Sequence, residues 1–256
     1  MPIDETSPDF VTALARGLAV LRCFGPETRE LTLSQVAAHM DLNRATARRF
    51  LLTLESLGYV RADGRRFSLT ARVLDLGYTF LSSLDLRDMA QPVLKGVVEE
   101  VGEACSLSVF DSPDVVYVAQ VPPRHLMYVP VSVGRRLPAY PTAMGRVLLA
   151  GLPPVDLDAY FAAGPRQRYT PHTVVAEKAL RRILAEVKAD GYAVADQEYV
   201  DGARAVAVPV VGADGRVTAA LNVSAHANRV TKGDMVKRIL PVLRAAATGI
   251  ARGRSG

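Results

Sequence analysis

LTLSQVAAHMDLNRATARRFLLTLESLGYVRADGRRFSLT, residues 31–70, decides the fold of the N-terminal part of the chain. Apolar residues recur in it at helical spacing on both sides of a turn at Asp41-Leu42, and Asn43 is a good cap for the second helix. Two short strand-like runs then flank Asp63-Gly64, a dipeptide typical of a β-hairpin. The stretch therefore predicts a winged helix-turn-helix.

The second of these helices has two chemically different sides. Its buried side is expected to hold the residues that recur at helical spacing, which are Ala47, Phe50, Leu51, Leu54 and Leu57. The opposite side carries Ala45, Arg48, Arg49, Leu52 and Ser56, with Arg44 and Thr46 near the leading end. An exposed side that bears arginines suits a helix that enters the DNA major groove.

Positive charge is concentrated in the same region. Residues 43–72 hold seven arginines and two acids, a net charge of +5, whereas residues 1–42 have a net charge of −3. No lysine occurs before Lys95, and arginine can pair with phosphate or guanine through two parallel hydrogen bonds. The clustering predicts contact with double-stranded DNA, although a basic face that is merely solvated would have the same composition.

Candidate DNA contacts follow from both helices and the hairpin tip. Arginine can read the O6 and N7 atoms of guanine, and Ala45 or Thr46 can touch a thymine methyl group. Half or more of the arginines are expected to hold phosphate, without the sequence saying which, and Leu52 is expected to pack on the wing. The predicted DNA-binding residues are Ser34, Asn43, Arg44, Ala45, Thr46, Arg48, Arg49, Arg65 and Arg66.

Residues 71–84, ARVLDLGYTFLSSL, read as a connecting helix. Val73, Leu74, Gly77 and Leu81 share one stripe, which predicts a linker and dimerisation element. An ordinary core helix of one continuous domain is the alternative. The predicted boundaries are 1–70 for the DNA-binding domain, 71–85 for the linker helix and 86–256 for a second domain.

Helices and antiparallel strands make the second domain α+β. The strands are expected at 106–110, 115–121, near 127–130, 192–198, 205–211 and 217–224, and the helices at 86–101, 142–150, 176–190 and 231–252. Pro209 places its strand at an edge or a bulge, and Pro241 is expected to kink the last helix.

The chain resembles the IclR family of bacterial transcription regulators from about Phe10 to Arg252. The carrying segments are ALARGLAVLRCF at 13–24, LSQVAAHMDLNRATARRFLLTLESLGYV at 33–60, LPAYPTAMGRVLLAGL at 137–152, GYAVADQEYVDGARAVAVPV at 191–210 and AALNVSAHANRVT at 219–231. Within the family, the segments at 136–152, 168–173 and 221–231 are most similar to the branch that controls protocatechuate and 4-hydroxybenzoate catabolism. The resemblance implies a winged helix-turn-helix, a linker helix, a GAF-like effector-binding domain, operator DNA as partner, and dimers or tetramers.

The resemblance also implies a small organic-acid effector such as protocatechuate, 4-hydroxybenzoate or β-ketoadipate, held beside the sheet. The residues expected to line its pocket are Val129, Val131, Gly134, Thr142, Ala143, Met144, Gly145, Asp196, Glu198, Ala205, Asn222 and Ser224. Free amides at the helix start near Thr142 suit a carboxylate. Asn222 and Ser224 share one strand face and can bind a hydroxyl or carboxyl group.

Plainer interpretations of these residues stay open. The sheet face can be ordinary core in which Asn222 meets backbone. Asp196 and Glu198 suit an anion only where Arg204 or Arg146 neutralises them, and those arginines can equally form structural ion pairs.

Other functional classes lack support in the sequence. There is no G-x-S-x-G, Walker, G-x-G-x-x-G or H-E-x-x-H motif, and the four histidines lack metal-ligand spacing, so neither an enzyme nor a cofactor is expected. Cys23 and Cys105 sit in apolar contexts as free thiols, and no apolar run reaches membrane-spanning length, which favours the cytoplasm and no membrane partner. Beside a ligand-responsive regulator, two hypotheses remain: an architectural DNA-binding protein whose second domain only oligomerises, and an enzyme on a GAF-like core.

Overall fold

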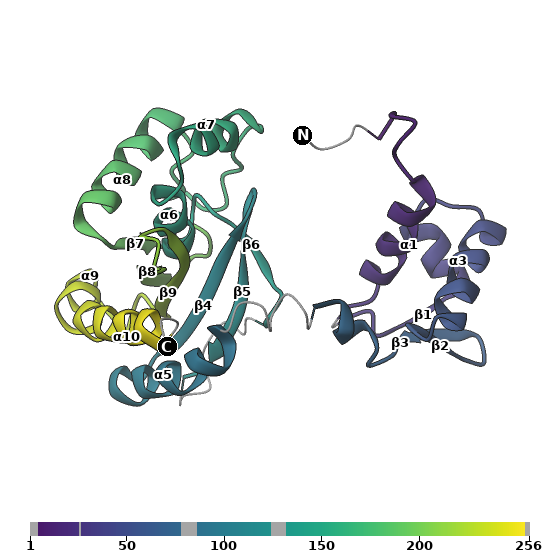
Figure 1. Ribbon diagram of the computed structural model, residues 1–256, viewed down its shortest axis with the longest axis horizontal. Helices are drawn as coiled ribbons and strands as arrows, with labels where there is room; N and C mark the ends of the chain where they lie inside the picture. The colour runs from purple at the N-terminus through teal and green to yellow at the C-terminus, as the bar shows by residue number, and fades with distance from the viewer. Residues whose placement is uncertain (1–4, 26, 78–85, 124–131, 254–256) are drawn as a thin grey trace. The chain divides into compact units, whose positions relative to one another are not determined.

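The computed structural model describes residues 5–25, 27–77, 86–123 and 132–253 (Figure 1). The chain divides into two compact units, Met1–Ser83 and Leu84–Gly256, each described below by itself. The predicted strand near 127–130 and most of the second half of the linker helix lie outside the described residues. So do two of the candidate effector residues, Val129 and Val131.

The first unit is a winged helix-turn-helix, as predicted. Its elements are α1 (Thr12–Arg22), β1 (Glu30–Thr32), α2 (Leu33–His39), α3 (Arg44–Ser56), β2 (Val60–Asp63) and β3 (Arg66–Leu69). The three strands form an antiparallel sheet in the order β1-β3-β2. Gly64 turns the β2–β3 hairpin with a positive φ of 58°, a conformation that glycine adopts without strain.

Local capping explains where the two central helices begin. The Thr32 side chain accepts a hydrogen bond from the Gln35 amide, and the Gln35 side chain accepts one from the Thr32 amide, which completes a capping box for α2. Asn43 caps α3 by accepting from the Thr46 amide at 2.8 Å. Strand β1 was not expected from the sequence, because its three residues are stabilised by pairing with the distant β3.

A small apolar core holds this unit together. Its buried members are Val20, Phe24, Leu31, Val36, Leu51, Leu54 and Val60, contributed by α1, α2, α3 and the sheet. Beyond the wing, residues 73–77 are helical, in agreement with the first part of the predicted linker helix. Leu74 is 74% exposed, so within the described residues its apolar stripe is uncovered.

The second unit is α+β and is built on one antiparallel sheet in the order β6-β5-β4-β9-β8-β7. The strands are β4 (Ala104–Asp111), β5 (Asp114–Val121), β6 (Arg136–Pro138), β7 (Ala193–Asp196), β8 (Ala203–Val211) and β9 (Val217–His226). The helices are α5 (Leu86–Val101), α6 (Ala143–Ala150), α7 (Pro154–Ala162), α8 (Glu177–Asp190), α9 (Lys232–Asp234) and α10 (Leu240–Gly253). A π-helical turn, Met235–Ile239, joins α9 to α10.

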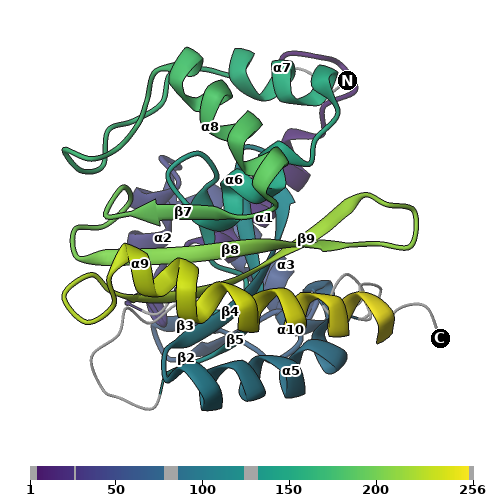
Figure 2. The same ribbon diagram turned by 90° about the vertical axis from the view of Figure 1, so that its left-hand side faces the viewer.

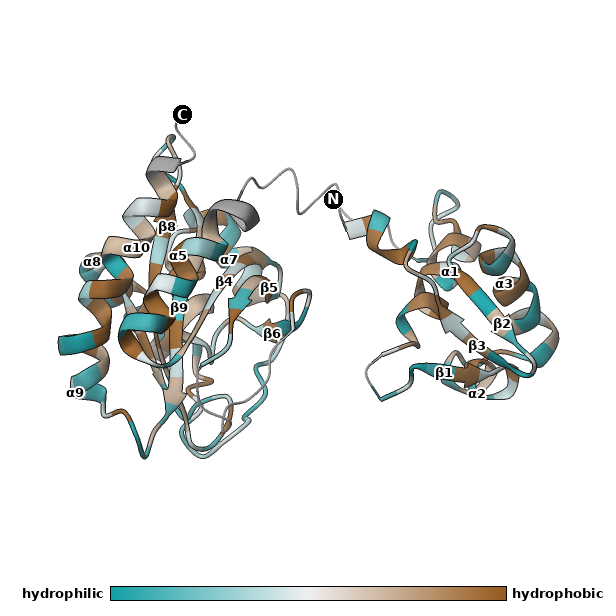
Figure 3. Ribbon diagram, turned by 90° about the horizontal axis from the view of Figure 1, so that it is seen from below, coloured by the Kyte–Doolittle hydropathy of each residue, from teal (hydrophilic) through white to brown (hydrophobic). Residues whose placement is uncertain are grey.

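Helices cover both faces of this sheet. Helices α5 and α10 pack on one face, and α6 packs on the other with α8 beyond it (Figure 2). Helix α8 alternates between hydrophilic and hydrophobic residues along its length, as a helix with one buried side should (Figure 3). The functional residues considered below lie on the α6 side.

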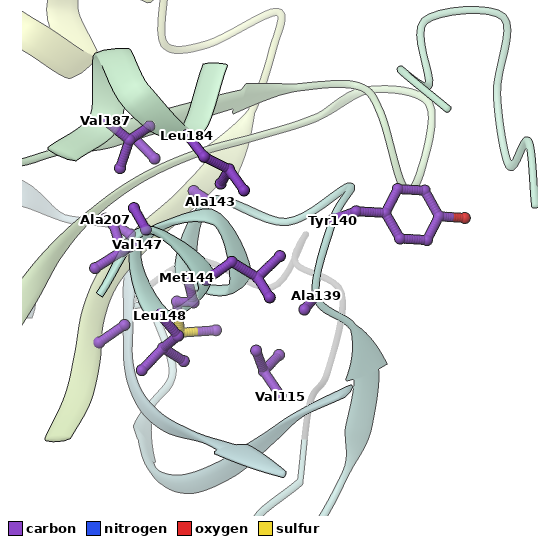
Figure 4. Packing of buried hydrophobic residues seen from close by; sticks show 14 of the residues in the cluster. Val115, Ala139, Tyr140, Ala143, Met144, Val147, Leu148, Leu184, Val187 and Ala207 are labelled. Atoms are coloured by element: carbon purple, nitrogen blue, oxygen red, sulfur yellow. The ribbon is translucent and has the colours of Figure 1, made fainter. Parts of the chain in front are cut away.

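The core on the α6 side is the larger described cluster of apolar residues. Met144, Val147 and Leu148 of α6 lie between the sheet and α8, with Leu184 and Val187 opposite them (Figure 4). Every residue of α6 is buried. The position of α6 is therefore set by packing on all sides.

Two prolines behave partly as predicted. Pro209 lies in β8, which is an internal strand, but β7 pairs with β8 only up to Ala207, so no ladder bond is lost at Pro209. The register against β9 shifts just beyond it, at Val210 and Val211. Pro241 lies just after the π-helical turn, a local departure from α-helix of the kind that a residue without an amide proton produces.

Candidate functional site

The basic face predicted on α3 is present. Ala47, Leu51 and Leu54 are buried against the core of the first unit, whereas Ala45, Arg48 and Arg49 are exposed. The cap at Asn43 fixes the first turn, so the arginines project from a helix whose start is well defined. This is the arrangement needed for side chains to reach base edges or phosphates.

The other predicted DNA-binding residues surround this face. Ser34 lies on the first turn of α2, Arg65 in the hairpin turn and Arg66 at the start of β3. Arg66 lies 3.8 Å from Glu30, but both side chains are more than half exposed, so the pair is weak and Arg66 can exchange it for a phosphate. Of the nine predicted residues, only Thr46 is half-buried, and the rest are exposed.

Leu52 does not pack as expected. It is 41% exposed and is absent from the apolar core of the first unit, so the wing does not cover it. It lies on the same side of α3 as Arg48 and Arg49, where an apolar group can contact thymine methyls.

A cavity of about 420 Å³ lies in the second unit, beside the start of α6. This volume is in the range of small-molecule sites. Its floor is the central sheet, with the short side chains of Ala104, Ala195 and Ala205, and its roof includes Leu137 and Met144. Its remaining polar and charged lining comes mainly from the segment 198–204 and from β9 and the turn after it.

The start of α6 offers hydrogen-bond donors to this cavity. Thr142 caps the helix, its Oγ1 accepting from the Gly145 amide at 3.1 Å. The Arg146 amide donates to the Thr142 carbonyl at 3.0 Å. The amides of Ala143 and Met144 precede the helical bonding pattern and have no intrahelical acceptor. Together with the helix dipole, two such amides form a seat for a carboxylate.

Gly145 has a structural role here. A β-carbon on it would lie 2.0 Å from the carbonyl oxygen of Ala139, so only glycine allows the chain to pass this close to α6. Gly145 is absent from the cavity lining. Its contribution to the site is to let the helix start where it does.

Asn222 is the buried amide of the cavity. It is 4% exposed, and its Oδ1 has no hydrogen-bond partner among the described residues. The idea that this side chain meets backbone is therefore not supported by the geometry. Ser224 lies two residues further on the same strand face and also lines the cavity.

Both predicted acids are neutralised by arginine. Arg146 and Glu198 form a buried ion pair at 2.6 Å, and the Val174 amide donates to the same carboxylate at 3.1 Å. Asp196 pairs with Arg204 at 2.7 Å and with Lys232 at 3.0 Å. Burial alone would raise the pKa of Asp196, but the hydrogen bonds from these two cations outweigh it and lower the pKa.

The structure brings seven of the twelve predicted effector residues into the cavity lining: Thr142, Ala143, Met144, Glu198, Ala205, Asn222 and Ser224. Gly134, Gly145 and Asp196 lie outside that lining. The Gly134 amide donates to the Tyr117 carbonyl at 2.7 Å, and the Asp196 carboxylate is occupied by its cations.

Several lining residues were not predicted. They include Tyr117, Leu137, Tyr199, His226 and the arginines at 135, 204 and 229. Arg204 and Arg229 are held by ion pairs, the latter to Glu103 at 2.8 Å. Burial raises the pKa of Tyr117, so its phenol stays protonated and can donate. Alternation along β5 could have suggested Tyr117, but nothing local to the arginines indicates that they meet at one cavity.

Metal and membrane functions find no structural support in the described ranges. No group of three or more His, Cys, Asp or Glu side chains there could hold a metal ion. Nor does any helix there combine the length and apolar character needed to cross a bilayer.

A winged helix-turn-helix followed in one chain by an α+β unit with a ligand-sized cavity defines a class of DNA-binding transcription regulator. Comparison with known families agrees: the model of the IclR helix-turn-helix domain matches residues 13–64, and that of the bacterial transcriptional regulator IclR C-terminal domain matches residues 78–252. The chain belongs to the IclR family of bacterial transcriptional regulators.

Three relatives show how close this likeness is. The Pca regulon regulatory protein of Pseudomonas putida is 42% identical over 93% of this chain and 82% of its own. The p-hydroxybenzoate hydroxylase transcriptional activator of Acinetobacter baylyi is 35% identical over 92% of this chain and 89% of its own. The crystal structure of an IclR homolog from Microbacterium hydrocarbonoxydans, complexed with 4-hydroxybenzoate, has a TM-score of 0.83 at 27% identity and covers 95% of this chain and 99% of that one.

Proposed function

We propose that this regulator binds operator DNA through α3 and the wing, and that a small organic acid in the cavity of the second unit sets its DNA affinity. The observation that carries the proposal is the cavity itself, where the open amides of Ala143 and Met144 and the unpaired Asn222 line one space. A domain that served only to oligomerise would have no need of these unmade hydrogen bonds, because a buried unpaired group costs about 1–3 kcal/mol.

The chemistry of the cavity supports an acid of modest size. Its charged lining residues include both arginines and acids, and the described ion pairs occupy Arg204, Arg229 and Glu198. Attraction for an anion therefore comes chiefly from the start of α6. The relatives point to the same class, since one activates p-hydroxybenzoate hydroxylase transcription and another was crystallised with 4-hydroxybenzoate. The candidate effectors are protocatechuate, 4-hydroxybenzoate and β-ketoadipate.

The organisation around these sites completes the proposal. We assign residues 1–70 to DNA binding, 71–85 to a linker helix that contributes to dimerisation, and 86–256 to effector binding. A single recognition helix reads few base pairs, so we expect a dimer or tetramer on an operator with repeated half-sites. We expect the protein to act in the cytoplasm and to catalyse no reaction.

Calorimetry and DNA binding together test this function. The full chain is titrated with each candidate acid, and its affinity for an operator selected from random DNA is measured with and without the acid. Because a ligand shifts DNA affinity only when it binds the DNA-competent and incompetent states unequally, an acid that binds should also change operator affinity. Binding of no candidate acid, or binding without any change in operator affinity, would contradict the proposal and favour an architectural role.

A further inference from the structure

Asn222 makes a demand that the described protein groups do not meet. Its register neighbours are Ser106 on β4 and Ala207 on β8, and neither hydrogen-bonds to its Oδ1. A buried carbonyl oxygen without a donor weakens a fold, and native proteins keep few of them. Where one is kept at the wall of a cavity, the missing donor is expected to come from what the cavity binds.

Short side chains leave room for that donor. Ala104, Ala195 and Ala205 share the sheet face of Asn222 and line the cavity around it. A flat ring can therefore lie against the sheet, beneath Leu137 and Met144. In the absence of a ligand, water can occupy this polar part of the cavity, and a ligand group that reproduces the hydrogen bond can displace it without loss.

The two polar parts of the cavity ask for opposite chemistry. The amides at the start of α6 are donors, and they suit the acceptor oxygens of a carboxylate. Asn222 Oδ1 is an acceptor and needs a donor. Neither a carboxylate nor a keto group supplies a proton at neutral pH, but a hydroxyl group does.

We propose that the effector carries a hydroxyl group in addition to its carboxylate, and that this hydroxyl donates to Asn222 Oδ1. The inference rests on the proposed function and narrows its ligand class to hydroxybenzoates. It excludes benzoate and β-ketoadipate as the preferred ligand, because both leave Oδ1 unpaired. Sites built to hydrogen-bond a ligand hydroxyl discriminate strongly against analogues that lack it.

Isothermal titration of the full chain tests the inference. The probes are 3-hydroxybenzoate, 4-hydroxybenzoate, protocatechuate, benzoate and β-ketoadipate. The best hydroxybenzoate should bind the wild-type chain at least about tenfold more tightly than benzoate, the lower limit for an unpaired buried group. In Asn222→Leu, which replaces the carboxamide by an apolar group of similar volume, that preference should vanish because hydroxybenzoate affinity falls and benzoate affinity does not.

A matched control separates the hydroxyl contact from a general effect on the sheet. Ser108 lies on the same sheet face and its Oγ is also buried without a partner, but it is outside the cavity lining. Ser108→Ala should leave the preference unchanged. The thermal midpoint of ligand-free Asn222→Leu should not fall, since an unpaired polar group has been removed, and Asn222→Ala provides a second variant should the larger side chain disturb folding.

The outcomes distinguish this inference from the function on which it rests. Benzoate or β-ketoadipate as the tightest ligand, or equal weakening of hydroxybenzoate and benzoate in both Asn222 variants, would overturn the hydroxyl contact and leave the acid effector in place. Failure of all five acids to bind the wild-type chain would overturn both.

Discussion

Replacing Gly145 by alanine should damage both the stability of the second unit and its effector site. The new β-carbon would meet the Ala139 carbonyl oxygen at 2.0 Å, whereas ordinary contact begins at 3.4 Å. The obstacle is backbone rather than a flexible side chain, so α6 or the segment before it must move by well over an ångström. Because α6 is buried on all sides, that movement cannot be absorbed by solvent.

The expected loss can be estimated from packing. Forcing extra atoms into a packed interior costs about 1–3 kcal/mol and occasionally more, and a backbone clash this close belongs at the upper end. For a unit of this size, a loss of about 3 kcal/mol lowers the melting temperature by about 6–12 °C. The same displacement moves the amides of Ala143 and Met144, so acid affinity should also fall.

Thermal unfolding and calorimetry of the full chain check both effects, with Gly96→Ala as the control. Gly96 is also helical, in α5, but a β-carbon there would meet nothing within 4 Å. Alanine should therefore stabilise at that position, by about 0.5–1 kcal/mol. A melting temperature for Gly145→Ala within a degree or two of the wild type would refute the argument that close backbone approach requires glycine at this position.

Three further changes test other parts of the molecule. Arg48→Ala combined with Arg49→Ala should weaken operator binding by at least about 1–3 kcal/mol and flatten its salt dependence, measured by fluorescence anisotropy across a salt series; unchanged binding would remove α3 from the interface. Glu198→Gln leaves the Arg146 charge buried without its partner and should cost about 3–5 kcal/mol in thermal unfolding, whereas a loss under 1 kcal/mol would mean that water compensates. The pKa of Asp196 lies below its ordinary value of 3.8, so its stabilising effect is complete above that pH and is lost as pH falls through the lower value; Asp196→Asn should be less stable at neutral pH and show a shallower acid transition.

Elements with strong local signals were predictable from the sequence. The cap at Asn43, the pairing of Thr32 with Gln35, and the Asp63-Gly64 turn each involve residues within a few positions of one another. The winged helix-turn-helix could be predicted because its elements begin and end at such signals. Strands β4, β5, β8 and β9 were predictable for the same reason, as alternating or apolar runs between turns.

Features that depend on distant pairing were not predictable. Strand β1 is three residues long and is stabilised by Leu31 lying opposite Phe67. Strand β6 likewise depends on β5, with Leu137 opposite Val115. Helix α7 has no strong amphipathic pattern and was not anticipated.

The candidate site shows the same division. Thr142 and Asn222 belong to motifs that could be recognised along the chain, and both line the cavity. Asp196 carries the same apparent chemistry, but two cations from β8 and α9 draw it out of the site. Only the folded arrangement shows which of two similar acids is in the lining.

Helix α6 indicates how binding at the cavity can be transmitted. Its first turn presents the free amides, and its next residue but one after Met144 is Arg146, whose guanidinium is joined to Glu198. Glu198 begins the segment 198–204 of the cavity wall, and its carbonyl accepts from the Thr173 hydroxyl at 2.6 Å. An acid on α6 therefore acts on a helix that is tied to the opposite wall and, through it, to the loop before α8. Because these ties are short and buried, a shift of α6 cannot occur without a matching shift of that wall, which is the kind of paired rearrangement that lets a ligand favour one state of a regulator over another.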